Sequence, residues 1–145
     1  LQSNKCRETA QHFDWLQSLD REKLIEPLNR FRSEYAAPLN VLIQVNIDGE
    51  ASKSGCAPAA VPKLAEAIAR APRLRLRGLM AIPEPHPDPA HRRGAFARMR
   101  ELFESQHADH PGIDTLSMGM TDDFELAIAA GATLVRIGTA LFGPR

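Results

Sequence analysis

The sequence predicts an α/β fold, namely a partial (β/α)8 TIM-type barrel made of its last five βα units with parallel strands. Strand-like and helix-like segments alternate along the 145 residues, which is typical of a parallel sheet. Five units occupy about 29 residues each, so eight would need about 230, the usual size of such a barrel. Glycine-containing turns follow the last two strands, where these barrels often bind phosphate. We therefore expect residues 1–145 to be the C-terminal part of a single barrel domain whose first three units are missing.

The first two units carry the clearest strand. Residues 14–19 form a short predicted strand, and Asp20 is expected to cap a helix that extends to Phe31 and is kinked or delayed by Pro27. Residues 39–47 are almost continuously apolar and rich in β-branched side chains. A parallel strand that is covered on both faces has this composition.

The remaining units follow the same alternation. Val61, Leu64, Ala65 and Ile68 recur at helical spacing, and Pro72 ends that helix. Gly131 is expected as the residue after the helix at 122–130. In chain order, we predict a strand at 74–81, a helix at 90–106, a strand at 114–118, a helix at 122–130, a strand at 133–137 and a closing helical turn at 139–142.

A flavodoxin-like open sheet is the structural alternative, because it also has five strands. Its phosphate-binding loop normally follows the first strand. In this sequence, the turns predicted to bind phosphate follow the last two strands. The sequence therefore favours the barrel over the open sheet.

Composition and cysteine spacing argue against several classes of function. The 18 basic and 18 acidic residues cancel, which argues against a general attraction to nucleic acid or to a membrane surface. No apolar run approaches the roughly 20 residues of a membrane span. Cys6 and Cys56 match no metal or redox motif, which suggests free thiols in the reducing cytoplasm. The five histidines show no metal-ligand spacing.

Two successive strand-to-helix turns predict a phosphate cup. The first runs from Ser117 to Thr121 and contains Gly119, and the second runs from Arg136 through Gly138 to Thr139. The glycines allow a ligand to approach the backbone closely, and the threonines offer a hydroxyl or a helix cap. Amides in the first turn of a helix attract anions.

Acidic residues decide which of the two turns should carry most of the phosphate contact. Asp122 and Asp123 follow the first turn and would repel an anion there. We therefore expect the phosphate mainly at Gly138 and Thr139, with Ser117 and Thr121 contributing from the side.

Arg136 is the charged residue of an otherwise apolar strand. Alternation places it, with Leu134 and Gly138, on the face opposite Val135 and Ile137. A buried arginine needs hydrogen-bond acceptors. Either an ion pair with a carboxylate at a strand end or an acceptor atom of a ligand would satisfy it, and its neighbours favour the ligand.

The polar loop Ser52-Lys-Ser-Gly55 follows the strand at 39–47, on the face where a barrel has its active site. It is interpreted as a solvated loop, with a mobile lid or an anion contact as the alternative.

These motifs together resemble the pyridoxal phosphate homeostasis protein family, which is itself similar to the N-terminal barrel of alanine racemase. The resemblance covers the whole chain in order. It rests on Leu1-Gln-Ser-Asn-Lys5, Leu39-Asn-Val-Leu-Ile-Gln-Val-Asn46, Ser52-Lys-Ser-Gly55, Arg75-Leu-Arg-Gly-Leu-Met-Ala-Ile82, Leu116-Ser-Met-Gly-Met120 and Val135-Arg-Ile-Gly-Thr-Ala-Leu-Phe-Gly143.

The resemblance implies a barrel that binds pyridoxal 5′-phosphate (PLP) without established catalysis and that stores PLP or delivers it to PLP-dependent apoenzymes. It places Arg136 at the pyridine nitrogen, and Ser117, Gly119, Thr121, Gly138 and Thr139 around the phosphate. Thr121 departs from the serine usual in the family. The Schiff-base lysine of such barrels lies on the first strand, and none of Lys5, Lys23, Lys53 and Lys63 matches its motif.

Two other function classes stay open at this point. A PLP-dependent amino-acid racemase or decarboxylase has the same barrel, usually followed by a second, β-rich domain. A barrel enzyme acting on a phosphorylated sugar or acid would need no PLP, and it would lack the visible absorption of that cofactor.

Overall fold

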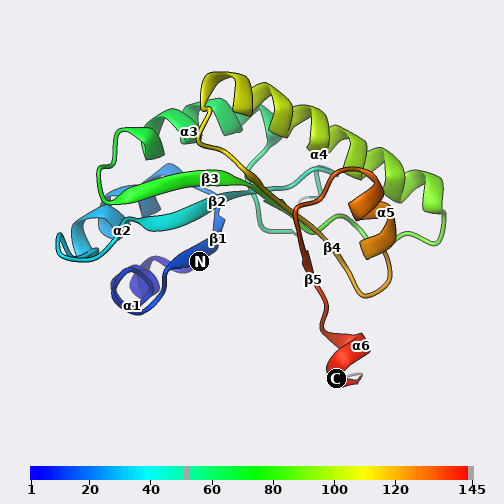
Figure 1. Cartoon of the computed structure of the whole chain (residues 1–145), viewed down its shortest axis with the longest axis horizontal. Helices are drawn as coiled ribbons and strands as arrows, with labels where there is room; N and C mark the ends of the chain where they lie inside the picture. Colours follow the sequence, from blue (N-terminus) through cyan, green and yellow to red (C-terminus); the bar gives the residue numbers. More distant parts are fainter. Residues whose placement is uncertain (51–52, 144–145) are drawn as a thin grey trace.

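Five parallel strands lie side by side in the order in which they occur along the chain (Figure 1). The computed structural model describes residues 1–50 and 53–143. A flavodoxin-like sheet reverses its strand order near the middle, so the sequential order excludes that alternative and confirms the barrel-type winding. The strands are β1 (Trp15–Leu19), β2 (Leu39–Val45), β3 (Leu74–Ala81), β4 (Thr115–Met120) and β5 (Leu134–Arg136).

Helices connect each strand to the next. The α-helices are α1 (Cys6–His12), α2 (Ile25–Phe31), α3 (Val61–Ala69), α4 (Pro89–Asp109), α5 (Phe124–Ala129) and α6 (Thr139–Phe142). Short 3-10 turns, η1 (Ser3–Lys5), η2 (Glu22–Leu24) and η3 (Pro58–Ala60), precede α1, α2 and α3. All five predicted strands and the predicted helices are present, with ends that differ by a few residues.

The start of α2 differs from the prediction. Asp20 does not cap it: the capping position of η2 is Arg21, whose side chain makes no capping bond, and Asp20 instead pairs with Arg21 at 3.3 Å. Pro27 lies in the first turn of α2, where an amide has no partner within the helix. The regular helix is therefore delayed until after η2, as the proline suggested.

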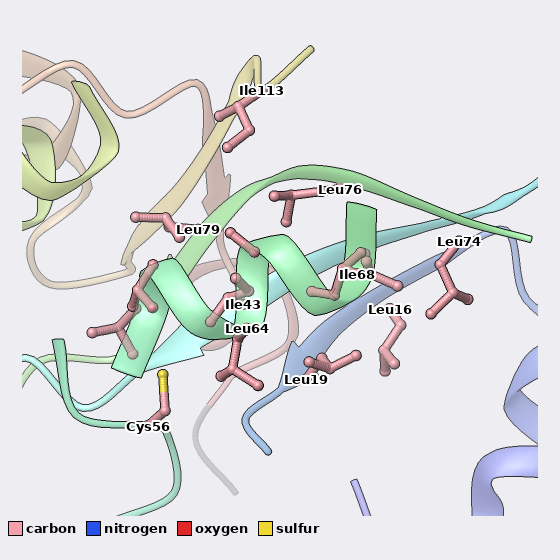
Figure 2. Close-up of a cluster of buried hydrophobic side chains, with 14 of the residues drawn as sticks. Leu16, Leu19, Ile43, Cys56, Leu64, Ile68, Leu74, Leu76, Leu79 and Ile113 are labelled. Carbon is pink, nitrogen blue, oxygen red and sulfur yellow. The ribbon is translucent and has the colours of Figure 1, made fainter. Parts of the chain in front are cut away.

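One face of the sheet packs against helices and forms the apolar core. Val41, Ile43 and Val45 of β2 are almost fully buried there with Leu64 and Ile68 of α3. Figure 2 shows these two α3 side chains gathered with leucines from β1 and β3. Burying one such aliphatic side chain contributes about 1.5–3 kcal/mol. The helical spacing read from the sequence of α3 therefore identified its buried face correctly.

The opposite face of the sheet is concave and carries polar side chains among apolar ones. The Ser117 hydroxyl on β4 donates to Gln17 Oε1 on β1 at 2.7 Å, although β2 and β3 lie between these strands. Such a bond requires the sheet to curl toward this face, as the wall of a barrel does. The five strands thus form a half-barrel whose inner surface carries polar groups.

A second cluster on this face links β3 to its neighbours. Nε and Nη2 of Arg77 donate to the Asp114 carboxylate at 3.0 and 2.6 Å, and Nη1 donates to Asn40 Oδ1 at 3.0 Å. The guanidinium also lies over the Trp15 ring, 4.7 Å from its centroid. These contacts sit toward the strand starts, at the end opposite to the predicted phosphate cup.

The end of α5 confirms the role predicted for Gly131. This glycine has φ of +92° and donates to Ile128 O, while the Ala132 amide donates to Ala127 O. The two bonds form a Schellman motif. It turns the chain sharply into β5 and so helps to place Arg136.

Two further features concern the chain as a whole. Cys6 and Cys56 are buried free thiols, and burial raises the pKa of Cys56 to about 11, which keeps that thiol protonated and unreactive. Among residues 1–50 and 53–143, no helix has both the length and the apolar character needed to cross a bilayer.

Candidate functional site

Arg136, the last residue of β5, reaches across the ends of two other strands. Its Nη1 donates to Ser117 Oγ at 2.6 Å and, at 3.4 Å, to the Ser117 carbonyl oxygen. Its Nη2 donates to the Ala81 carbonyl oxygen at 3.0 Å. The guanidinium is therefore fixed by β3 and β4 at the C-terminal edge of the half-barrel.

The charge of Arg136 is not paired directly in the described part of the chain. Its hydrogen-bond acceptors are all neutral oxygens. Burial lowers the pKa of Arg136 from its ordinary value, and the negative charge of Asp123 partly opposes this shift. Because the ordinary pKa of arginine lies far above neutral pH, Arg136 stays protonated there. The sequence left open an ion pair or a ligand as the partner, and the described residues supply no ion pair.

Arg136 borders a small cavity between the turn after β4 and the start of α6. The cavity has a volume of about 140 Å³ and is lined by Met120, Thr121, Asp122, Arg136, Gly138 and Thr139. The structure thus brings together four of the six predicted site residues, which come from two successive strand ends.

Gly138 and Thr139 offer a ligand open space and backbone amide donors. A Cβ built on Gly138 would meet nothing within 4 Å, so the missing side chain leaves open room rather than accommodating a neighbour. Within the described ranges, the amides of Gly138 and Thr139 donate to no backbone acceptor, whereas those of Leu141 and Phe142 donate to Gly138 O. Unpaired amides at the start of a helix are suited to an anion.

The two threonines lie at the cavity but do not cap their helices as expected. Asp123 precedes α5 and Gly138 precedes α6 as the capping residues, each without a side-chain capping bond. Thr121 Oγ1 instead accepts a hydrogen bond from the Ala140 amide at 3.3 Å. This contact ties the turn after β4 to α6 and so closes one side of the cavity.

The two acidic residues beside the cavity, Asp122 and Asp123, face different surroundings. Asp123 Oδ1 accepts from the Met120 amide at 2.7 Å, so its carboxylate faces the end of β4. Asp122 lines the cavity and adds negative charge on that side. An anion is therefore favoured on the Gly138 and Thr139 side, away from Asp122.

Ser117 and Gly119 are not among the residues that line this cavity. Ser117 is fully buried, and its hydroxyl is engaged by Arg136 and Gln17. Gly119 has φ of +93°, and a Cβ there would lie 2.5 Å from the Ala127 Cβ. The close approach that Gly119 permits within this chain is thus to α5, and its approach to a ligand stays a prediction.

Gln17 is the residue of this region that sequence reasoning missed. It is one of two polar residues in the short strand β1, next to Ser18, and its partner Ser117 lies 100 residues further along the chain. A polar residue within the predicted strand at 14–19 could have drawn attention to Gln17. The neighbouring sequence, however, does not identify Ser117 as its partner.

The loop after β2 was a second candidate. Ser52 lies outside the described residues. Lys53 Nζ pairs with Glu50 Oε1 at 2.7 Å, and a Cβ on Gly55 would lie 2.6 Å from the Asn46 amide nitrogen. Gly55 is therefore explained by packing against the end of β2, while the solvated loop and its alternative, a lid or an anion contact, both stay predictions.

Comparison with known proteins finds relatives along the whole chain. The model of the alanine racemase N-terminal domain matches residues 1–145. A pyridoxal phosphate homeostasis protein of Pseudomonas aeruginosa is 58% identical over the whole of this chain, which spans 62% of that relative. The corresponding protein of Escherichia coli K12 is 52% identical, again over 62% of its length.

Solved structures support the same fold. PipY of Synechococcus elongatus, determined with PLP bound, superposes with a TM-score of 0.83 at 35% identity, over 99% of this chain and 67% of PipY. D-threonine aldolase of Filomicrobium marinum reaches a TM-score of 0.77 at 21% identity, over 98% of this chain and 41% of the aldolase. At that identity the aldolase indicates a shared fold and nothing about chemistry.

Proposed function

The chain belongs to the alanine racemase N-terminal domain family, and from this premise we propose that it forms the phosphate and ring-nitrogen side of a PLP site in a PLP homeostasis protein. The protein binds and releases PLP and does not turn over amino acids. The observation that carries the proposal is the position of Arg136, which borders the same cavity as Gly138 and Thr139.

The chain's own groups fit a phosphorylated aromatic ligand. Gly138 leaves an open space that any larger side chain would fill, and the amides of Gly138 and Thr139 are directed to no backbone acceptor in the described ranges. Thr121 and Thr139 add hydroxyl groups at the cavity wall. These donors match the acceptor oxygens of a phosphate.

Arg136 supports binding over catalysis. When bound, PLP supplies an electron-accepting ring, and protonation of its pyridine nitrogen strengthens this property. Arg136 can only donate hydrogen bonds and keeps its own proton. Facing the pyridine nitrogen, it would leave that nitrogen unprotonated and so weaken the electron demand of the ring.

Some parts of the proposed site lie beyond this chain. The chain spans 62% of the pyridoxal phosphate homeostasis protein of Pseudomonas aeruginosa, and Lys5, Lys23, Lys53 and Lys63 are not among the residues that line the cavity. We therefore assign the covalent anchor of PLP to a lysine outside residues 1–145. Delivery of PLP to apoenzymes and a reducing, cytoplasmic setting, which suits two free thiols, belong to the same proposal.

Titration of the full-length protein with PLP tests the proposal. We expect a visible absorption band from bound PLP and little or no racemisation or decarboxylation of amino acids. Replacing Arg136 with Leu removes a charged donor, worth about 1.5–3 kcal/mol, and should weaken PLP binding at least about tenfold. Rapid turnover by the wild-type protein that is lost in Arg136→Leu would establish the enzyme alternative. Absence of any PLP absorption band would favour a barrel enzyme that uses no PLP.

A further inference from the structure

Three side chains form a continuous hydrogen-bonded chain across the concave face of the sheet. Arg136 Nη1 donates to Ser117 Oγ at 2.6 Å, and Ser117 Oγ donates to Gln17 Oε1 at 2.7 Å. The three residues come from β5, β4 and β1. Ser117, in the middle, is fully buried, so water does not compete for its hydroxyl.

The chemistry of the guanidinium fixes the direction of the first bond, and the structure gives the direction of the second, from Ser117 Oγ to Gln17 Oε1. A guanidinium has donors only, so Ser117 Oγ must accept from Arg136. The single Ser117 proton is then available to an acceptor, and the carbonyl oxygen of the Gln17 amide is the acceptor within reach. The amide of Gln17 is consequently oriented with its oxygen toward Ser117 and its NH2 group away from it.

The chain of bonds holds the end of a long, flexible side chain in one orientation. Ser117 and the Ala81 carbonyl oxygen engage Nη1 and Nη2 of Arg136. No acceptor is assigned to Arg136 Nε within the described residues, and Nη2 carries a second proton. The guanidinium is therefore anchored on one side and retains donors for a ligand.

We propose that Gln17 and Ser117 are positioning residues that orient Arg136 toward the ring of PLP, with Gln17 fixing the Ser117 proton so that the hydroxyl accepts from the guanidinium. This rests on the proposed function, and it assigns Ser117 to the support of Arg136 instead of to the phosphate. Without the Gln17 acceptor, the Ser117 hydroxyl can rotate, and Arg136 Nη1 loses its fixed side-chain acceptor while the Ala81 carbonyl oxygen still holds Nη2.

The test uses the full-length protein loaded with PLP labelled with ¹⁵N in the pyridine ring. The ¹⁵N signal reports the protonation and hydrogen bonding of the ring nitrogen, and the ³¹P signal reports the phosphate independently. Gln17→Met, which removes the acceptor at similar size, and Ser117→Ala should move the ¹⁵N signal toward that of Arg136→Leu. Both should leave the ³¹P signal in place and weaken PLP binding about three- to tenfold, the effect of one hydrogen bond.

Two further variants complete the test. Gln17→Glu retains an acceptor oxygen and should keep the wild-type ¹⁵N signal. Gln44→Met makes the matched change on β2, where the Gln44 amide contacts Ser54 O at 3.3 Å, and should also leave the ¹⁵N signal unchanged. If Gln17→Met does not fold, Gln17→Glu and Ser117→Ala decide the question.

A wild-type ¹⁵N signal in Gln17→Met or Ser117→Ala, alongside a moved signal in Arg136→Leu, would overturn the positioning role while the proposed function stands. A changed signal in Gln17→Glu would overturn it as well. Failure of the wild-type protein to bind PLP would overturn the proposed function and this inference together.

Discussion

At the scale of single residues, two glycines of the same predicted site have different roles, one in ligand binding and the other in packing. A Cβ on Gly138 would enter open space at the cavity, and its φ of −119° suits any residue. Gly138→Val should therefore leave stability nearly unchanged but obstruct the phosphate. We expect PLP affinity of the full-length protein to fall at least about tenfold, which corresponds to losing one charged hydrogen bond, measured by titration of the PLP absorption.

Gly119 provides the matched control for Gly138. A Cβ there would collide with Ala127 of α5, and its φ of +93° disfavours any other residue. Gly119→Val should lower the free energy of unfolding by about 2–3 kcal/mol, as overpacking and backbone strain do. Equal stability losses in the two variants, or unchanged PLP affinity in Gly138→Val, would contradict the division of roles.

At the scale of elements, the contact between β3 and β4 depends on Gly78. This residue has φ of +153° and lies so close to Thr115 that an added Cβ would overlap the Thr115 carbonyl oxygen. Gly78→Ala should separate the strands locally and lower the free energy of unfolding by about 3 kcal/mol or more, the upper part of the range for single substitutions. Urea denaturation of the full-length protein measures this, and a loss below about 1 kcal/mol would show that the strands adjust easily.

β3 and the residue just before β4 are joined by an ion pair, Arg77–Asp114, that should respond to acid. Hydrogen bonds from Arg77 hold the pKa of Asp114 below its usual range. A carboxyl whose pKa is lowered by folding stabilises the protein above its unfolded pKa of about 3.9, and the contribution is lost as the pH falls through the folded value. Because the Asp114 side chain is 55% exposed, the effect should be small.

Urea denaturation at neutral pH and near pH 3 measures the acid effect. The free energy of unfolding should fall on acidification, and it should fall less in Asp114→Asn, which has no carboxyl to protonate. Equal losses in the wild type and in Asp114→Asn would contradict a role for this ion pair in acid sensitivity.

Most elements could be predicted because each carries a local signal. β2 is almost continuously apolar, α3 has apolar residues at helical spacing, and Gly131 ends α5 by the expected motif. The errors arise where a polar group has a choice of partners. Asp20 pairs with Arg21 instead of capping a helix. Gln17 accepts a hydrogen bond from Ser117, and only the curvature of the sheet brings these two residues together.

At the scale of the whole molecule, the structure is a half-barrel with two terminal strands. Among the described residues, β1 pairs with β2 alone and β5 pairs with β4 alone. Large apolar side chains are exposed near these ends, including Phe13, Trp15, Leu141 and Phe142, which are 39–87% exposed. Unpaired strand edges with adjacent apolar surface favour association with another chain.

The half-barrel should therefore behave differently as an isolated polypeptide and within a longer one. A polypeptide of residues 1–145 alone would expose the edges of β1 and β5, so we expect it to self-associate as its concentration rises. Light scattering after size exclusion measures this, and the full-length protein under the same conditions is the control. Charged substitutions at the edge, such as Ser18→Lys in β1, should reduce the association because charge on an edge strand opposes pairing. A polypeptide that stays monomeric at every concentration, with cooperative unfolding, would instead show that these five units bury enough surface to be stable with both edges open.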